Sequence, residues 1–176
     1  NYDFENTFDG KEDGAGWEGS WTAFGGTDEN QCMEAYGMTF DVHQEAKSAP
    51  VGLYEVSLQG FFRIERGQSA YDLYLEGDQL SPGGVYVNNN MNLMKCVFDE
   101  PVRTNDSIFS NQALATGPES NPSLIIDTTT GESLYFPNDM LTAGEAFSAG
   151  MYVSKALGLV AKAGDELRIG VKGSLG

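Results

Sequence analysis

The segment from Leu53 to Arg63 constrains the fold most, because its side chains alternate between apolar and polar. One side of it carries Tyr54, Val56, Leu58 and Phe62, and the other carries Glu55, Ser57 and Gln59. A period of two is typical of a half-buried β-strand. Gly60 interrupts the run and indicates a bulge or a close backbone approach. The segment is therefore predicted to be the strongest strand of the chain.

Several other segments share this alternation or are bounded by turn-forming residues. Strands are predicted at residues 17–24, 38–43, 71–76, 83–87, 94–98, 151–161 and 166–172. The last two flank Lys162–Asp165 and predict a β-hairpin. Residues 94–98 are expected to return from an Asn-rich turn at Asn88–Asn90, whereas residues 101–134 are predicted to be mainly a long connection.

One short helix is predicted after Pro137. Asn138 can cap it, and the next apolar side chains fall at the spacing of one helix face, at Met140, Ala143, Gly144 and Phe147. Many short strands with almost no helix predict an all-β fold, an antiparallel β-sandwich or jelly roll with one short helix. No composition break divides residues 1–176, so they are expected to form a single domain.

Composition agrees with a packed core that needs no disulfide or metal. The chain has 176 residues, of which 40% are hydrophobic, with 10 Phe, 8 Tyr and 2 Trp. Cys32 and Cys96 form no CxxC motif, which makes a zinc site improbable. They are either a disulfide or two buried thiols, and the spacing leaves both alternatives open.

The net charge of -16 bears on the partners that the chain can bind. A field of this sign repels phosphate backbones and anionic headgroups, which argues against nucleic acid and membrane surfaces. No apolar run is long enough for a membrane span. The first residues lack the pattern of a signal peptide, and the start on Asn1 indicates a processed or trimmed chain.

Three stretches, Glu34–Gln44, Val51–Arg63 and Asp165–Lys172, match a known pattern in order. They resemble the galactose-binding-like jelly-roll domains, similar to carbohydrate-binding modules, of secreted glycan-degrading proteins of gut anaerobes. In that family a "tFDvyQ" strand precedes "lpnGtYrlsvqgFyR", and a late "g.LriGik" strand follows a short helix. The chain departs at His43, where the family usually has Tyr. It also stops at Gly176, before a final "DNFrLyY" strand that the family pattern predicts.

The resemblance implies a calcium-tolerant β-sandwich with a non-catalytic, carbohydrate-binding role in a secreted or cell-surface protein. The expected partner is a glycan ligand or an attached glycosidase domain. Calcium, if bound, would be structural. Ligand identity, oligomeric state and neighbouring domains are left open.

Sugar binding requires aromatic faces that stack on the ring and amides or carboxylates that bond its hydroxyls. The residues of these types near predicted loops are Trp17, Trp21, Tyr36, Tyr86, Asn88, Asn89 and Asn90. Trp21 and Tyr36 are the strongest candidates, because polar turns flank them. The alternative is that these aromatic side chains belong to the core or its rim.

The stretch Asp9–Gly14 resembles a calcium loop in part, with Asp9 and Asp13 as candidate ligands. However, Lys11 stands where a ligand belongs and the downstream Glu is absent. A solvated acidic loop is the alternative interpretation.

Catalytic motifs are not found. His43 is the single histidine, and no GxSxG, P-loop, Rossmann fingerprint or HExxH occurs. The 26 acidic residues make a carboxylate pair inevitable somewhere and therefore uninformative. The chain is predicted not to be an enzyme. A structural or protein-interaction sandwich domain of a cell-surface assembly and, last, a small glycosidase are the alternatives.

Overall fold

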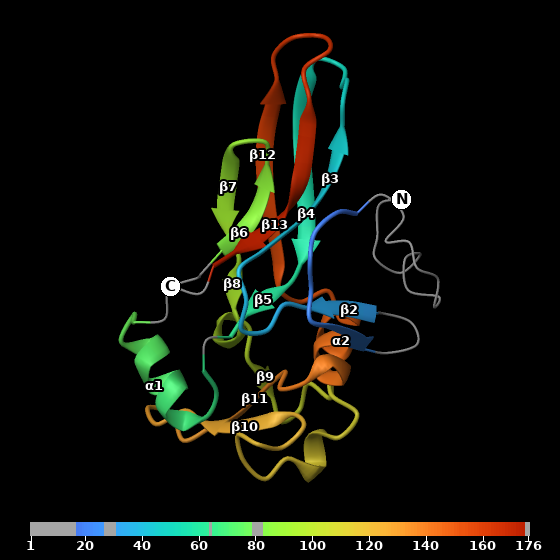
Figure 1. The fold of residues 1–176 in the computed structure, drawn as a ribbon. Helices are drawn as coiled ribbons and strands as arrows, with labels where there is room; N and C mark the ends of the chain where they lie inside the picture. The colour runs from blue at the N-terminus through green and yellow to red at the C-terminus, as the bar shows by residue number, and fades with distance from the viewer. Residues whose placement is uncertain (1–16, 27–30, 64, 79–82, 175–176) are drawn as a thin grey trace.

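The computed structural model describes residues 17–26, 31–63, 65–78 and 83–174, and antiparallel strands dominate it (Figure 1). The strands are β1 (Ala23–Gly26), β2 (Gln31–Glu34), β3 (Phe40–Ala46), β4 (Gly52–Gln59), β5 (Phe61–Phe62), β6 (Gly83–Val87), β7 (Asn90–Leu93), β8 (Lys95–Cys96), β9 (Val102–Arg103), β10 (Ser123–Ile126), β11 (Ser133–Phe136), β12 (Val153–Val160) and β13 (Leu167–Gly173). The helices are α1 (Gln68–Leu75), α2 (Met140–Ser148) and two short 3₁₀ segments, Val97–Asp99 and Gln112–Leu114. The predicted all-β class is confirmed, but two α-helices are present in these ranges where one is predicted.

Two antiparallel sheets pack against each other in the upper part of Figure 1. One has the strand order β3-β13-β6-β7, and the other consists of β12 and β4. The side chains that meet between them are Val85, Val87 and Ala156, with Tyr54, Val56, Leu58, Leu167 and Ile169 packed round them. The apolar face of the strongest predicted strand therefore points into this core. The strand itself ends at Gln59, and after Gly60 the short β5 pairs in parallel with β8.

The predicted terminal hairpin is wrong, because β12 and β13 belong to different sheets. β12 pairs with β4 from Val153↔Gln59 to Val160↔Gly52, whereas β13 pairs with β3 and β6. The connection at residues 161–166 thus arches from one sheet to the other. It lies beside the arch between β3 and β4, where the Ala49 amide donates to the Asp165 carbonyl at 3.0 Å. Each strand has an apolar face, and the arches bring those faces together as a hairpin within one sheet could not.

The β6–β7 hairpin is shorter than the strands around it. Val87 pairs with Asn90, so the turn consists of Asn88 and Asn89, and Asn88 takes the left-handed φ of 52° that suits a tight turn. The return strand is Asn90–Leu93 rather than the predicted 94–98. Beyond this turn, β3, β4, β12 and β13 continue upward in Figure 1. We call residues 45–53 and 159–168 the arm.

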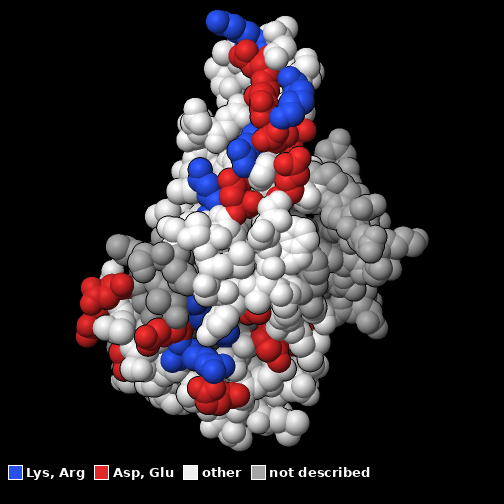
Figure 2. Space-filling model, in the orientation of Figure 1, with Lys and Arg blue, Asp and Glu red and all other residues white. Residues whose placement is uncertain are grey.

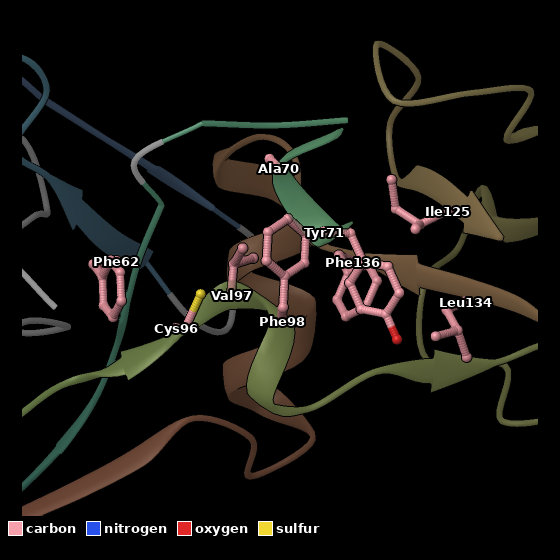
Figure 3. Close-up of a cluster of buried hydrophobic side chains, with 9 residues drawn as sticks. All are labelled: Phe62, Ala70, Tyr71, Cys96, Val97, Phe98, Ile125, Leu134 and Phe136. Atoms are coloured by element: carbon pink, nitrogen blue, oxygen red, sulfur yellow. The ribbon is translucent and has the colours of Figure 1, made fainter. Parts of the chain in front are cut away.

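The lower part contains a second core beside the three-stranded sheet β10-β11-β9. Figure 3 shows its buried members, Phe62, Ala70, Tyr71, Cys96, Val97, Phe98, Ile125, Leu134 and Phe136. Phe98 and Phe136 meet edge to face with ring centroids 5.1 Å apart. The sheet lies within the region predicted to be a long connection, which therefore has more regular structure than expected.

The strand predicted at residues 71–76 is wrong, because this segment forms helix α1. Ala70, Tyr71 and Tyr74 fall on one helix face and pack into the lower core, whereas Leu73 and Leu75 are exposed. The local alternation of apolar and polar residues is thus overridden by packing at helical spacing.

Helix α2 confirms the predicted helix, with one change at its start. The N-cap is Asp139, whose carboxylate accepts from the Thr142 amide at 2.9 Å, and not Asn138. The Asn138 side chain instead donates to the Ser120 carbonyl at 2.8 Å. α2 packs on a third buried cluster that includes Cys32 and Tyr152.

Of the strand predicted at residues 17–24, only the last two residues lie in a strand, β1. β1 begins at Ala23 and pairs with β2, and Glu18 forms an isolated antiparallel bridge to His43. Cys32 and Cys96 are two buried thiols rather than a disulfide, which resolves the two alternatives left open by the sequence. Within the described ranges, no helix is long and apolar enough to cross a membrane.

Candidate functional site

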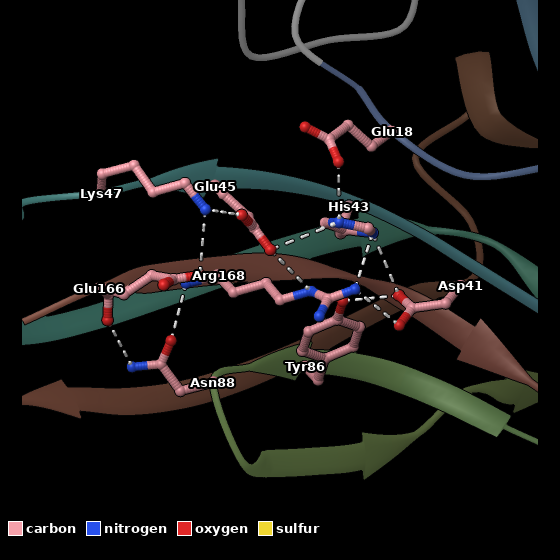
Figure 4. A network of polar contacts seen from close by, with 9 residues as sticks. All are labelled: Glu18, Asp41, His43, Glu45, Lys47, Tyr86, Asn88, Glu166 and Arg168. Atoms are coloured by element: carbon pink, nitrogen blue, oxygen red, sulfur yellow. Dashed lines mark hydrogen bonds and ion pairs between the residues drawn. The ribbon is translucent and has the colours of Figure 1, made fainter.

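A polar network covers the outer face of the four-stranded sheet (Figure 4). Its members come from the polar positions of β3 and β13, from β6 and from the bridge at Glu18. We call it the Arg168 network, and it consists of Glu18, Asp41, His43, Glu45, Lys47, Tyr86, Asn88, Glu166 and Arg168. The strand period places these side chains together, because apolar residues at the alternate positions point into the sandwich.

Arg168 lies at the centre of the network. Its Nη2 donates to Asp41 Oδ2 at 3.0 Å and lies 3.1 Å from His43 Nδ1, and its Nε lies 3.6 Å from Glu45 Oε1. Because a guanidinium only donates, this contact is a hydrogen bond in the tautomer whose Nδ1 carries no proton. Nε2 faces the carboxylates of Glu18 at 3.6 Å and Glu45 at 3.7 Å. The buried histidine is thus held on both sides.

Lys47, in the arm, is the member of the network that follows β3. Its ammonium hydrogen-bonds the Glu45 carboxylate and lies 3.8 Å from Glu166 Oε1. This bond lowers the pKa of the Glu45 carboxyl, so Glu45 stays ionised beside Arg168.

Tyr86 lies on the same outer face and is 2% exposed. Its hydroxyl donates to Asp41 Oδ1 at 2.6 Å, and Lys172 Nζ lies 4.8 Å from the centre of its ring. Burial, together with the bond to Asp41, raises the pKa of the Tyr86 hydroxyl. The hydroxyl therefore remains a donor, and Asp41 is held by both Tyr86 and Arg168.

The Asn88 side chain ties the β6–β7 turn to β13. Its Oδ1 accepts from the Arg168 amide at 2.7 Å, and its Nδ2 donates to the Glu166 carbonyl at 3.4 Å. The turn is thus fixed at the place where β6 ends and β13 continues into the arm.

A hollow of about 520 Å³ opens at this place. It is lined by Asp41, Tyr86, Asn88, Asn89, Leu159, Val160, Ala161, Asp165, Glu166, Arg168 and Lys172. Three carboxylates, two cationic groups and two amides face it, and β12 supplies an apolar wall. Such a set can donate and accept several hydrogen bonds to one small ligand.

Three of the predicted binding residues, Tyr86, Asn88 and Asn89, come together at the hollow. Asn90 is exposed in β7 but does not line it. Tyr86 differs from its predicted role, because a ring that is 2% exposed cannot serve as an open stacking face. Instead, its hydroxyl holds Asp41 at the hollow, and its ring lies beneath the Lys172 ammonium.

The other predicted aromatic residues lie before β1 and after β2. Trp17 and Trp21 are half-buried, whereas Tyr36 is 75% exposed. The Tyr36 amide donates to Thr22 Oγ1 at 2.8 Å, which ties the segments of Trp21 and Tyr36 to each other. Tyr36 is therefore the most open aromatic surface among the predicted residues.

Sequence reasoning missed Asp41, Arg168 and Lys172 as site residues. The signal was present, since Asp41 and His43 occupy the polar positions of one predicted strand and Arg168 and Lys172 those of another. What the sequence lacks is the pairing of β3 with β13, which brings the two rows together.

The predicted calcium ligands Asp9 and Asp13 lie outside the described residues. Among the residues that are described, no group of three or more His, Cys, Asp or Glu side chains is arranged to hold a metal ion.

Figure 2 shows how charge is distributed on the face in view. Lys and Arg alternate with Asp and Glu along the arm, so the acidic residues there are interspersed with cations.

The comparisons give this site no precedent: no protein-family model, curated protein or solved structure matches the chain.

Proposed function

We propose that this chain is a non-catalytic carbohydrate-binding domain of a secreted or cell-surface protein, and that the hollow beside Tyr86 and Asn88 holds the sugar. The observation that carries the proposal is the hollow's set of polar groups, which the Arg168 network holds in position. Asp41 is bound by Tyr86 and Arg168, and Asn88 by two contacts to β13. Groups fixed before binding lose little entropy when the ligand arrives.

The mixed charge of the hollow favours a neutral ligand rich in hydroxyl groups. Asp41, Asp165 and Glu166 would repel an anion, whereas Arg168 and Lys172 would repel a cation. A sugar hydroxyl both donates and accepts, so it can pair with either kind of group. Leu159, which is 61% exposed, offers an apolar side chain for the C–H side of the ring.

Glycan-array screening followed by calorimetry with the strongest ligand tests the proposal. Asn89→Ala removes an exposed amide that lines the hollow, and Asn90→Ala is its matched control one residue further on. We expect Asn89→Ala to weaken binding by about tenfold, the scale of one lost polar contact, and Asn90→Ala to leave it unchanged.

Tyr36→Ala and Trp21→Ala distinguish the hollow from the exposed aromatic surface. Binding that survives these changes but weakens in Asn89→Ala supports the hollow. The reverse result would move the sugar site to Trp21 and Tyr36, and the absence of binding to any glycan would refute the function itself.

A protein-interaction domain is the second candidate function. The observation that favours it is an apolar surface on the outer face of β4 and β12, which is independent of the hollow's polar groups.

A further inference from the structure

The outer face of the two-stranded sheet carries a cluster of exposed aliphatic side chains. They are Leu53 (70% exposed), Leu157 (49%) and Leu159 (61%), and we call them the leucine face. Exposed leucines are common when they are scattered, but a contiguous cluster marks an interaction surface.

The pairing of β4 with β12 makes the cluster contiguous. Leu53 lies directly opposite Leu159, and Leu157 precedes Leu159 by two residues, so all three point to the same side. The alternate residues of both strands point inward, with Tyr54, Val56 and Ala156 in the sandwich core. The leucine face is therefore a second apolar surface of a sheet whose other surface is already covered.

The same face carries one acidic and one basic side chain, whose charges cancel. Glu55 and Lys155 lie diagonally across the two strands, since Glu55 pairs with Leu157 and Lys155 pairs with Ser57, and they form an ion pair of 2.7 Å. Ser57 and Gln59 are the neutral side chains beside them. This balance contrasts with the net charge of -16 on the whole chain. A second, equally acidic molecule can approach here without the repulsion that it meets over acidic surface.

We propose that a second copy of this chain packs on the leucine face, sheet against sheet, about a two-fold axis. The same patch then meets itself, so leucines bury leucines. Under the two-fold, Glu55 of one copy can lie near Lys155 of the other, which makes the pattern of charges complementary to itself. Apolar sheet faces are covered by another layer about 10 Å away, the usual spacing of stacked sheets.

Sedimentation velocity over a micromolar to millimolar range of protein tests this association. Leu53→Glu puts a charge on the face opposite Leu159, and Leu93→Glu is a matched control, because Leu93 is 62% exposed on β7 outside the leucine face. We expect a reversible dimer for the wild-type protein and for Leu93→Glu, and a monomer at every concentration for Leu53→Glu. The dimer fraction should rise with added salt, which screens the repulsion between two acidic molecules.

Leu157→Gln is a second variant that keeps the face neutral and decides the question if Leu53→Glu fails to fold. It should weaken dimerisation at least tenfold. A wild-type protein that stays monomeric throughout would overturn the proposal, as would equal dimerisation of Leu53→Glu or Leu157→Gln and Leu93→Glu. Leu159 belongs to both the leucine face and the hollow, whereas Leu53 and Leu157 do not line the hollow. Sugar binding measured on the monomeric variants therefore reports on the proposed function separately.

Discussion

Gly158 of β12 lies so close to Val87 of β6 that a Cβ atom on Gly158 would come within 2.4 Å of Val87 Cγ1 and 2.9 Å of the Val87 carbonyl oxygen. The two residues belong to different sheets, and Val87 is completely buried. The two sheets can therefore approach each other this closely only because Gly158 has no side chain. Leu159 and Asn88, the residues that follow Gly158 and Val87, both line the hollow, so the same contact also fixes one side of the candidate site.

Gly158→Ala should destabilise the protein by about 1–3 kcal/mol, the usual cost of forcing extra volume into a packed core. Urea unfolding of the wild type and the variant measures this difference. Gly117→Ala is a suitable control, because a Cβ atom there meets no atom within 4 Å. Equal stability of the Gly158 and Gly117 variants would show that the sheets can separate freely at this point.

Tyr152 joins the two halves of the fold through its hydroxyl. The hydroxyl donates to the carbonyls of Val97 and Glu100 at 2.9 and 3.1 Å, and the residue is fully buried. Tyr152→Phe keeps the contact of the ring with Phe61 but leaves both carbonyls without this donor, so we expect a loss of about 1–3 kcal/mol. Thermal unfolding should show a lower Tm, whereas Tyr36→Phe at an exposed position should not change it.

The alternation in β4 allowed its prediction from sequence, because one face is buried against the other sheet and the period of two survives. Helix α2 could be predicted for a similar reason, since its buried residues keep helical spacing. The strand prediction for residues 71–76 was wrong because their apolar residues fit both the strand period and the helical spacing. Only packing against the core around Phe98 and Phe136 selects the helix. The pairing of β12 with β4 has no local signal, since it depends on residues about 100 positions apart.

The candidate site was predicted only in part for the same reason. Asn88 and Asn89 form a local turn, which the Asn-rich sequence predicts, and Tyr86 precedes them. Asp41 and Arg168 are 127 positions apart and meet through the β3–β13 ladder. An aromatic type alone also says nothing of exposure, which is why Tyr86 was predicted as a stacking surface although its ring is covered.

Arg168→Gln should destabilise the protein by about 1 kcal/mol, because it removes the cation that Asp41, His43 and Glu45 share at a site that solvent partly screens. Adding Asp41→Asn should cost less than the sum of the single changes, since each single variant already breaks the pair. Urea unfolding of the four proteins gives the coupling. Arg103→Gln is the control, because its contact to Glu132 joins two exposed side chains and should contribute little. Additive effects at positions 41 and 168 would contradict the network.

The buried thiols predict how stability depends on alkaline pH. Burial raises the pKa of Cys32, and likewise that of Cys96, from about 9 to about 11. Below pH 9 both thiols are protonated in the folded and the unfolded chain, so they leave stability unchanged. Between pH 9 and 11 the unfolded chain loses these protons while the folded chain keeps them, and stability should fall as pH rises.

Urea unfolding at a series of pH values should show this decline in stability. The decline should be shallower in the Cys32→Ala, Cys96→Ala double variant, even though the cavities lower the stability of this variant at every pH. A thiol reagent at pH 8 should react slowly with the folded wild type and rapidly in denaturant. Rapid reaction of either thiol in the folded protein would show that burial does not protect it.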